Sequence, residues 1–472
     1  MTSSNTAPPP ATDPSSLPLP PRVGLPVVGA IPLMVRDPLG FVVSAREKYG
    51  DVYRLNFGVM DCVAVNHPRH VQHVLRDNAK YYVKGGPVWE QIRNLTGNGL
   101  ITSEGDFWLR QRRMLQPKFH REYLASMMNL MVQAIDETLV EWEQYVESGE
   151  PFDVSLAIAR MTMNAVVKTM FGADITPEER HLVSSELSYA MGYLLPGMAA
   201  QFLPKWIPFP GYKRFKQAVK TIDEIVFRLI ARRRKMEAGP EKDLIDLMLE
   251  AVDADTGDRM TDAQLRDEAF TVFLAGFETT STSLAFAFAC LAERPDVVQA
   301  MREECDPVVG ELKPNFSQLA RLPLTNMVFQ ESMRLFPPAY WIPRTATRDD
   351  VIDGFYIPKG TMVSVMAYVI HRRPDFWDAP DQFDPWRFTP ERSAGRNPLT
   401  LIPFGTGQRQ CIGKDFAIME AQLILARVMS KFDFELAPGF TLKPEIATAL
   451  RPKGGVWLRA RRRVREAKAQ VA

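Results

Sequence analysis

Four cysteines stand at positions 62, 290, 305 and 411, and only the last has neighbours that suit a reactive metal ligand. Cys411 lies in PFGTGQRQCIGKDF, among glycines and an arginine, with a predicted helix directly after it. A metal-bound thiolate needs backbone donors, positive potential and shielding from water. Glycines let N–H groups approach the sulfur, and the start of a helix adds positive potential. We therefore expect chemistry at Cys411 and ordinary packing at Cys62, Cys290 and Cys305.

A single cysteine limits the kind of metal centre that this segment can form. Zinc and iron–sulfur sites need several protein ligands, and no second cysteine lies near Cys411 in the sequence. A haem iron needs one axial thiolate, so a haem fits. A nucleophilic cysteine is the alternative, but it would need a histidine base, and the six histidines form no Cys–His pattern.

The stretch FGTGQRQCIG resembles the haem-binding loop of the cytochrome P450 family, the haem-thiolate monooxygenases. The resemblance covers roughly Pro20 to Leu458, with the family's motifs in order. It implies haem b (iron protoporphyrin IX) as the cofactor and Cys411 as the axial iron ligand. The loop residues that it implies around the cofactor are Phe404, Gly405, Arg409 and Gly413.

Upstream motifs agree with this resemblance. Glu331 and Arg334 form an ExxR pair, which shares one helix face, and FDPWRF supplies Arg387. The resemblance implies a structural Glu–Arg–Arg network, in which the loss of one member would leave buried charge unpaired.

The segment from Thr261 to Glu293 is the longest predicted helix, because Thr261 and Gln264 form a capping box and Pro295 ends it. It is apolar nearly all round, so it should be central and buried. Its LAGFETTST stretch resembles the family's oxygen-activation motif, in which small residues let the helix approach the porphyrin and an acid–alcohol pair delivers protons. The residues concerned are Ala275, Gly276, Glu278 and Thr279.

Four further residues resemble the family's haem-propionate contacts. Arginine suits this role because its planar guanidinium binds a carboxylate in a bidentate manner, and the tryptophan of the W-x-x-x-R helix can donate a further hydrogen bond. The four residues are Trp108, Arg112, Arg344 and Arg409.

The substrate should be apolar, and a fatty acid, a terpenoid or a macrocyclic natural product all fit. The resemblance implies pocket residues on 86–95, on an apolar lid over 193–209, on the long helix and on 339–342. The bulky or flanking candidates are Trp89, Phe273, Ala339, Tyr340 and Trp341.

Electrons should come from a separate ferredoxin (with its reductase) or flavodoxin-type donor, with O2 as co-substrate. We expect a basic docking face made of Arg110, Arg113, Lys118, Arg409 and Lys414. A peroxide-driven variant is the alternative enzyme, although Thr279 argues against it. A haem sensor or binding protein is the non-enzyme alternative, and it would need neither Thr279 nor an apolar pocket.

The elements that position these residues predict a mainly α fold with a minor antiparallel β component. We predict a Pro-rich, extended or disordered N-terminus over residues 1–22, one domain over 23–458 and a basic tail over 459–472. Lys and Arg number 57 against 56 for Asp and Glu, so the formal charge of +1 argues against nucleic-acid binding. No signal peptide or anchor pattern is visible, which predicts a cytoplasmic protein. We expect it to be a monomer.

Overall fold

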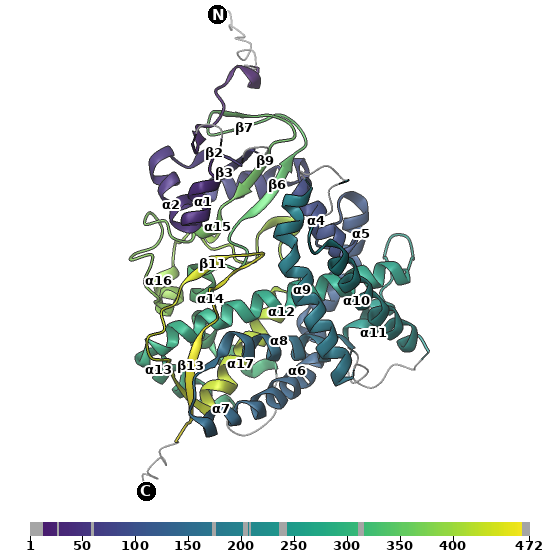
Figure 1. Ribbon diagram of the computed structural model, residues 1–472, viewed down its shortest axis with the longest axis vertical. Coiled ribbons are helices and arrows are strands. Elements are labelled where there is room, and N and C mark those ends of the chain that lie inside the picture. The colour runs from purple at the N-terminus through teal and green to yellow at the C-terminus, as the bar shows by residue number, and fades with distance from the viewer. Residues whose placement is uncertain are drawn as a thin grey trace, which may run out of the picture. The chain divides into compact units, whose positions relative to one another are not determined.

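The computed structural model of the chain describes residues 13–25, 28–57, 61–171, 176–201, 206, 209–235, 243–309 and 316–464 (Figure 1). These residues form two compact units. Unit 1 comprises the described residues within Met1–Gly86, Trp341–Ile370 and Thr406–Arg409. Unit 2 comprises the described residues within Pro87–Tyr340, His371–Gly405 and Gln410–Ala472. Each unit is built from three separate stretches of chain, so neither unit corresponds to the predicted single domain over 23–458. That single domain stays a prediction.

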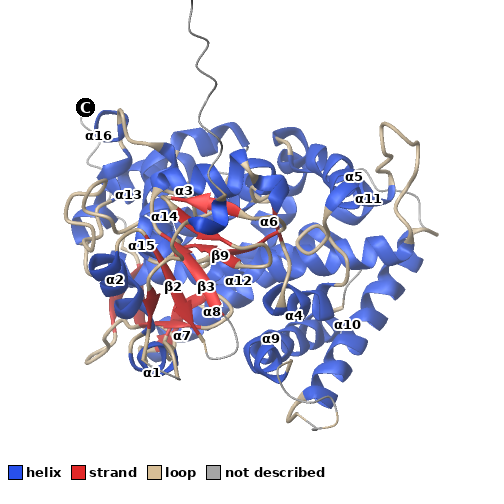
Figure 2. Cartoon of the chain, turned by 90° about the horizontal axis from the view of Figure 1, so that it is seen from above, coloured by secondary structure: helices blue, strands red, loops and turns tan. Residues whose placement is uncertain are grey.

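Unit 1 contains a six-stranded sheet in the order β1-β2-β3-β9-β6-β4, whose strands lie beside α2 and α15 in Figure 2. Most neighbouring strands are antiparallel, as predicted, whereas β1–β2 and β3–β9 are parallel. A parallel neighbour requires a long connection, and the chain builds much of unit 2 between β3 and β9. The elements of unit 1 are η1 (Pro14–Ser16), β1 (Arg22–Val23), α1 (Ile31–Arg36), α2 (Pro38–Tyr49), β2 (Val52–Asn56), β3 (Asp61–Val65), α3 (Pro68–Gln72), η2 (His73–Asp77), η3 (Ala79–Tyr81), β4 (Tyr82–Val83), β6 (Ile342–Ala346), β7 (Asp350–Ile352), β8 (Phe355–Ile357), β9 (Met362–Val365), α15 (Ala367–Ile370) and η8 (Gly407–Arg409).

Unit 2 is mainly helical, with one three-stranded sheet in the order β10-β13-β5 and the hairpin β11–β12. Its helices are α4 (Pro87–Thr96), α5 (Gly105–Leu115), α6 (Arg121–Glu141), α7 (Glu143–Ser148), α8 (Val154–Phe171), α9 (Pro177–Ala200), α10 (Tyr212–Arg233), α11 (Leu244–Leu249), α12 (Asp262–Ala292), α13 (Pro295–Val309), α14 (Pro323–Leu335), α16 (Pro390–Ser393) and α17 (Lys414–Lys431). Its strands are β5 (Phe152–Asp153), β10 (Phe432–Leu436), β11 (Pro444–Ile446), β12 (Leu450–Pro452) and β13 (Trp457–Arg462).

Helix α12 begins as predicted. The Thr261 hydroxyl accepts from the Gln264 N–H at 3.2 Å, and the Gln264 side chain accepts from the Thr261 N–H at 2.8 Å. This helix is long and apolar enough to cross a membrane, but 72% of its most apolar window is buried inside the fold. Its composition therefore reflects a core helix.

Two hydrophobic clusters of unit 2 meet along α12. Its first part, up to Phe277, packs in one cluster with α5, α8, α9 and α10. Its last part, from Leu284, packs in the other with α6, α13, α14 and α17. Between the clusters, residues 278–283 are all polar, with the sequence ETTSTS. A polar stretch at this depth in a core helix requires a structural or chemical reason.

Two helix boundaries depend on packing rather than on local pattern. Helices α6 and α7 are separated at Trp142, which ends one and precedes the other. Helix α9 continues through Pro196 to Ala200 and packs against α10, although a proline inside a helix removes a backbone hydrogen bond. The predicted lid over 193–209 falls partly outside the described residues.

The predicted terminal segments fold in part. Of the Pro-rich segment over 1–22, residues 1–12 lie outside the described residues. The rest contains η1, and strand β1 begins at its last residue, Arg22. At the other end, β13 extends to Arg462, beyond the predicted boundary at Leu458, because it pairs with β10 along its length.

Candidate active site

The acid–alcohol pair lies on the polar stretch of α12 between the two clusters. The Thr279 hydroxyl donates to the Ala275 carbonyl at 2.7 Å, a bond that threonine side chains form within helices. Glu278 is half-buried, and burial raises the pKa of its carboxyl to about 7, while the charge of Arg451 acts in the opposite direction. A carboxyl group with this pKa can both hold and release a proton near neutral pH.

Neighbouring hydroxyl groups also bond to the α12 backbone. Ser283 donates to the Thr279 carbonyl at 2.9 Å, and Ser281 donates to the Glu278 carbonyl at 3.1 Å. Thr162 of α8 donates to the Phe277 carbonyl at 3.3 Å. Side-chain hydroxyls that share helix carbonyls bend or loosen a helix, so this stretch is suited to a local groove.

The small residues of α12 have two different roles. Ala275 and Thr279, one turn apart, are exposed, whereas the adjacent Leu274 and Thr280 are buried. A Cβ atom at Gly276 would lie 3.1 Å from the Val166 side chain of α8. Gly276 therefore serves the close packing of α8 on α12, and the Ala275–Thr279 face is the one open to a ligand.

Cys411 differs from the other cysteines in exposure. Cys62, Cys290 and Cys305 are buried, as expected, and burial raises the pKa of each thiol to about 12, whereas Cys411 is exposed. The Cys411 N–H donates to the Phe404 carbonyl at 2.9 Å, which closes the loop into a compact turn. Buried thiols with such pKa values are inert, so Cys411 is the cysteine available for chemistry.

The Cys411 loop is built by glycines and a helix start. Gly405 has a φ of 64°, which favours glycine, and its N–H donates to the Ile402 carbonyl at 3.0 Å. Gly413 is the N-cap residue of α17, and no atom lies within 4 Å of a Cβ built there. Phe404 packs partly buried against the core. The N-terminus of α17 thus lies two residues after Cys411 and adds positive potential to it.

Arg112 of α5 lies beside this loop. Its Nη1 donates to the Gln410 carbonyl at 3.0 Å, and its Nε donates to the Gln116 side chain at 3.0 Å. Burial lowers the pKa of Arg112, and the charge of Cys411 acts in the opposite direction. Trp108, one turn earlier on the same helix, is buried.

The other two predicted propionate residues belong to unit 1. Arg344 is buried on β6, where its Nη1 donates to the Pro343 carbonyl at 2.8 Å. Arg409 ends η8, in which Gly407 has a φ of 72° and a Cβ would meet the Leu75 carbonyl oxygen at 2.2 Å. Their binding of propionates stays a prediction.

The Glu331 network is fully formed within unit 2. Glu331 accepts from Arg334 Nε at 2.7 Å and Nη2 at 2.8 Å, and from Arg387 Nε at 3.1 Å. The Glu331 and Arg334 side chains are 0% exposed, and Arg387 is 4% exposed. Arg334 also donates to the His371 carbonyl at 3.0 Å, so the network ties α14 to the segment before the Cys411 loop.

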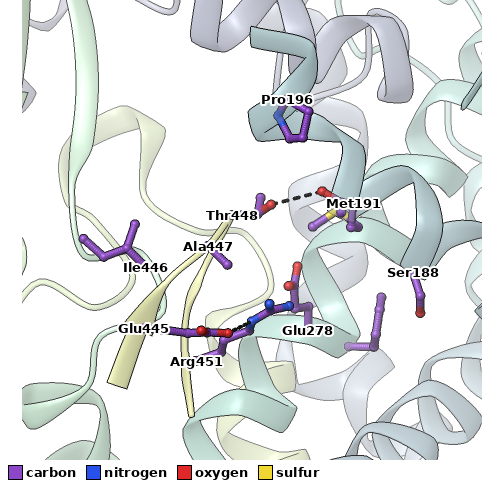
Figure 3. A pocket seen from close by; sticks show the side chains of 11 residues that line it. Ser188, Met191, Pro196, Glu278, Glu445, Ile446, Ala447, Thr448 and Arg451 are labelled. Atoms are coloured by element: carbon purple, nitrogen blue, oxygen red, sulfur yellow. Dashed lines mark hydrogen bonds and ion pairs between the residues drawn. The ribbon is translucent and has the colours of Figure 1, made fainter. Parts of the chain in front are cut away.

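A cavity of about 330 Å³ opens beside Glu278 (Figure 3). Its walls come from three elements, α9, α12 and the β11–β12 hairpin, and the described residues that line it are Ser188, Met191, Gly192, Pro196, Phe277, Glu278, Glu445, Ile446, Ala447, Thr448 and Arg451. The Thr448 hydroxyl donates to the Met191 carbonyl at 3.3 Å, which links the hairpin to α9.

The predicted pocket residues are placed differently from one another. Phe273 is buried in the core, and the centre of its ring lies 5.2 Å from the centre of the Phe171 ring. Trp89 is buried on α4. Neither lines the cavity beside Glu278. Tyr340 packs under the hairpin, with its hydroxyl 3.5 Å from the Ala447 carbonyl, and Ala339 is exposed. Trp341, the next residue, belongs to unit 1.

Sequence reasoning missed two charged residues near the α12 motif. Arg451 reaches the cavity from a hairpin more than 150 residues further along the chain. Glu420 of α17 is 0% exposed, and burial raises the pKa of its carboxyl well above the usual range, with Thr280 opposing the rise. A carboxylate within the mainly apolar stretch FAIMEAQLILA of α17 was the available signal for Glu420, whereas no local pattern marks Arg451.

The predicted basic face is partly neutralised by acidic residues. Arg113 forms ion pairs with Asp253, at 3.1 Å, and with Asp255. Arg110 pairs with Asp258 at 3.2 Å. The loop before α12 therefore compensates two of the expected charges, which the sequence could not reveal because the partners lie far apart in it.

Lys118 and Lys414 retain more of the expected basic character. The Lys118 ammonium lies 4.9 Å from the centre of the Tyr123 ring, and Lys414 is exposed at the start of α17.

The described residues fit a haem at this site. Within the described ranges, no group of three His, Cys, Asp or Glu side chains is placed to hold a metal ion. A porphyrin brings most of the ligands of its own iron, so the exposed thiol of Cys411 suffices. Arg112 supplies a cation beside the loop, and the Ala275–Thr279 face supplies a small, open surface of α12.

Comparison with known proteins identifies the family. The Cytochrome P450 family model matches residues 18–458. Cyclooctatin synthase of Streptomyces melanosporofaciens is 33% identical over 89% of this chain and 91% of its own length. Pentalenene oxygenase of Streptomyces avermitilis is 30% identical over 91% of this chain and 94% of its own. The crystal structure of the cytochrome P450DA heme domain matches with a TM-score of 0.85 and 28% identity, over 95% and 98% of the two chains.

The chain therefore belongs to the cytochrome P450 family, and its fold is the P450 fold. It is a P450 monooxygenase, and the family implies a haem cofactor, O2, an organic substrate and a redox partner.

Proposed function

We propose that this protein hydroxylates or epoxidises a terpenoid, using haem b, O2 and electrons from a separate ferredoxin- or flavodoxin-type donor in the cytoplasm. One observation carries the substrate class. Relatives that align along almost the whole chain are named for such compounds: pentalenene oxygenase, at 30% identity, and cyclooctat-9-en-7-ol 5-monooxygenase of Streptomyces melanosporofaciens, at 31% identity.

The cavity beside Glu278 supports a mainly apolar substrate. Met191, Pro196, Phe277, Ile446 and Ala447 supply carbon-rich walls. Glu278, Glu445 and Arg451 are its charged groups, so acids outnumber cations among the described lining residues. This balance disfavours a free fatty-acid carboxylate and favours a neutral substrate, such as a cyclic alkene or an alcohol.

The residues of the site have separate roles in this proposal. Cys411 holds the haem iron. The proposed partners of the haem propionates are Trp108, Arg112, Arg344 and Arg409. When bound, the haem supplies the redox chemistry that activates dioxygen.

Protons reach the site from α12. The Glu278 carboxyl, whose pKa of about 7 allows it to hold a proton at neutral pH, donates toward the groove. The Thr279 hydroxyl turns from the Ala275 carbonyl to pass the proton on.

Spectral titration of the purified holoprotein tests the substrate class. We expect pentalenene and a cyclic diterpene alcohol to shift the ferric haem from low to high spin, and palmitate and a macrolide to give smaller shifts. Turnover with a surrogate ferredoxin and its reductase should give mono-oxygenated terpenoid by mass spectrometry. A shift with palmitate alone, and oxygenated palmitate as the product, would overturn the proposal.

A further inference from the structure

Arg451 faces Glu445 directly across the β11–β12 hairpin. The register pairs the two residues, and Arg451 Nε lies 2.9 Å from Glu445 Oε1. The Arg451 side chain is 53% exposed and that of Glu445 is 31% exposed, so this ion pair by itself contributes little stability. Both side chains line the cavity that also contains Glu278.

Figure 3 shows the Arg451 guanidinium between two carboxyl groups. A dashed line joins it to Glu445, and its far side points toward the carboxyl group of Glu278 on α12. Helix α12 packs against β12, which keeps these side chains within reach of each other. Because the guanidinium is planar with donors on several sides, it can serve two carboxylates by a small rotation.

Among the residues that the structure describes, Arg451 is the cation whose charge acts on Glu278. The described lining residues of α9 are Ser188, Met191, Gly192 and Pro196, which carry no charge. From α8, Thr162 and Val166 approach this part of α12. On α17, Glu420 interacts with Thr280 instead.

We propose that Arg451 is a positioning residue for Glu278, and that its guanidinium is shared between Glu445 and Glu278 so that the hairpin sets whether Glu278 holds its proton. This inference rests on the proposed role of Glu278 as proton donor. With Arg451 turned to Glu445, the half-buried carboxyl keeps its proton. With Arg451 turned to Glu278, the carboxylate is stabilised and the proton leaves through the cavity.

If Arg451 is shared between Glu445 and Glu278, substitutions of Arg451 and of Glu445 should move the titration of Glu278 in opposite directions. Arg451→Gln removes the cation, so Glu278 should titrate at higher pH. Glu445→Gln removes the competitor, so Arg451 turns to Glu278, which should titrate at lower pH. An opposite charge at contact range typically moves a carboxyl pKa by about 1 unit or more.

The test is a pH titration of the carboxyl itself. The holoprotein is labelled with glutamate carrying ¹³C at Cδ, and the diamagnetic ferrous carbon-monoxide complex is observed by NMR. Glu278→Gln assigns the signal by its loss. Lys453→Gln is the matched control, because Lys453 is exposed two residues beyond Arg451 and is not among the cavity-lining residues.

We expect an upward shift of about 1 pH unit in Arg451→Gln, a downward shift in Glu445→Gln, and little change in Lys453→Gln. Arg451→Lys should restore most of the wild-type titration. In the Arg451→Gln background, Glu445→Gln should have little further effect, because Glu445 acts through Arg451. A shift no larger than that of Lys453→Gln would overturn the proposal, and so would additive effects in the double variant.

Turnover distinguishes the role of Arg451 from the proposed function. If the titration shifts as expected but Glu278→Gln leaves the product formed per electron unchanged, Arg451 positions Glu278 and the proton-donor role is wrong. If Glu278→Gln lowers that ratio but Glu278 titrates at the same pH in Arg451→Gln as in the wild type, the proton-donor role holds and the sharing of Arg451 is refuted.

Discussion

The Glu331 network offers the sharpest prediction about stability. Glu331→Gln keeps the size of the side chain but removes the one negative charge shared by Arg334 and Arg387. These three side chains are at most 4% exposed, so water cannot replace the missing carboxylate. Arg334 cannot move out to solvent, because it also donates to the His371 carbonyl at 3.0 Å and the Gln382 carbonyl at 3.1 Å.

The magnitude follows from the hydrogen bonds that the carboxylate accepts. Glu331 accepts two bonds from Arg334, one from Arg387 and one from the Asp384 N–H at 2.9 Å. Breaking a buried ion pair from one side costs about 3–5 kcal/mol in unfolding free energy. With an m value of about 3 kcal/mol/M in urea, the unfolding midpoint should fall by about 1 M or more.

The assay is urea unfolding of the holoprotein, followed by circular dichroism and by the carbon-monoxide difference spectrum. The control is Glu435→Gln, which breaks the exposed Arg461–Glu435 pair at 3.0 Å and should cost less than about 1 kcal/mol. Arg387→Gln, which leaves the Glu331–Arg334 pair intact, covers the case in which Glu331→Gln does not fold. A midpoint for both network variants equal to that of the control would refute the reasoning.

Three other outcomes are expected. Thr279→Ala should lower the product formed per electron several-fold while leaving the carbon-monoxide spectrum at the thiolate position, and unchanged coupling would contradict the proton path. Burial raises the pKa of Glu268 to about 8 from 4.5, so the folded state binds the extra proton and stability should fall as pH rises from about 4.5 to 8; Glu268→Gln should flatten this slope of the urea midpoint. Lys118→Glu should slow reduction by a ferredoxin at low salt more than Arg113→Glu does, because Arg113 is already paired with Asp253, and stopped-flow reduction rates at two salt concentrations measure the difference.

Local patterns predicted much of the fold and named the candidate residues of the site. The capping box at Thr261 placed the start of the long helix, because capping depends only on residues within one turn. The glycine-rich loop around Cys411 was recognised for a similar reason, since its turn and the helix after it are local in sequence. The Glu331–Arg334 pair lies on one face of α14, as its spacing predicts.

Packing adds contacts that local patterns do not indicate. The roles of Gly276 toward the cofactor and of Phe273 in the pocket stay predictions, and the structure adds Val166 of α8 as a neighbour of Gly276 and Phe171 as a neighbour of the Phe273 ring. Helix α9 continues through Pro196, because tertiary packing offsets the missing hydrogen bond.

The sequence by itself determined the order of motifs that indicates the family, and it named Cys411 as the proposed iron ligand and Glu278 and Thr279 as the proposed acid–alcohol pair, because each motif depends on residues close together in the chain. Only the tertiary structure decided the environment of those residues. Burial set the pKa of Glu278, and the hairpin brought Arg451 beside it. An acidic loop that is distant in the sequence but in direct contact in the fold neutralises the charges of Arg110 and Arg113. Electrostatic interactions depend on distance and burial in space, which sequence separation does not express.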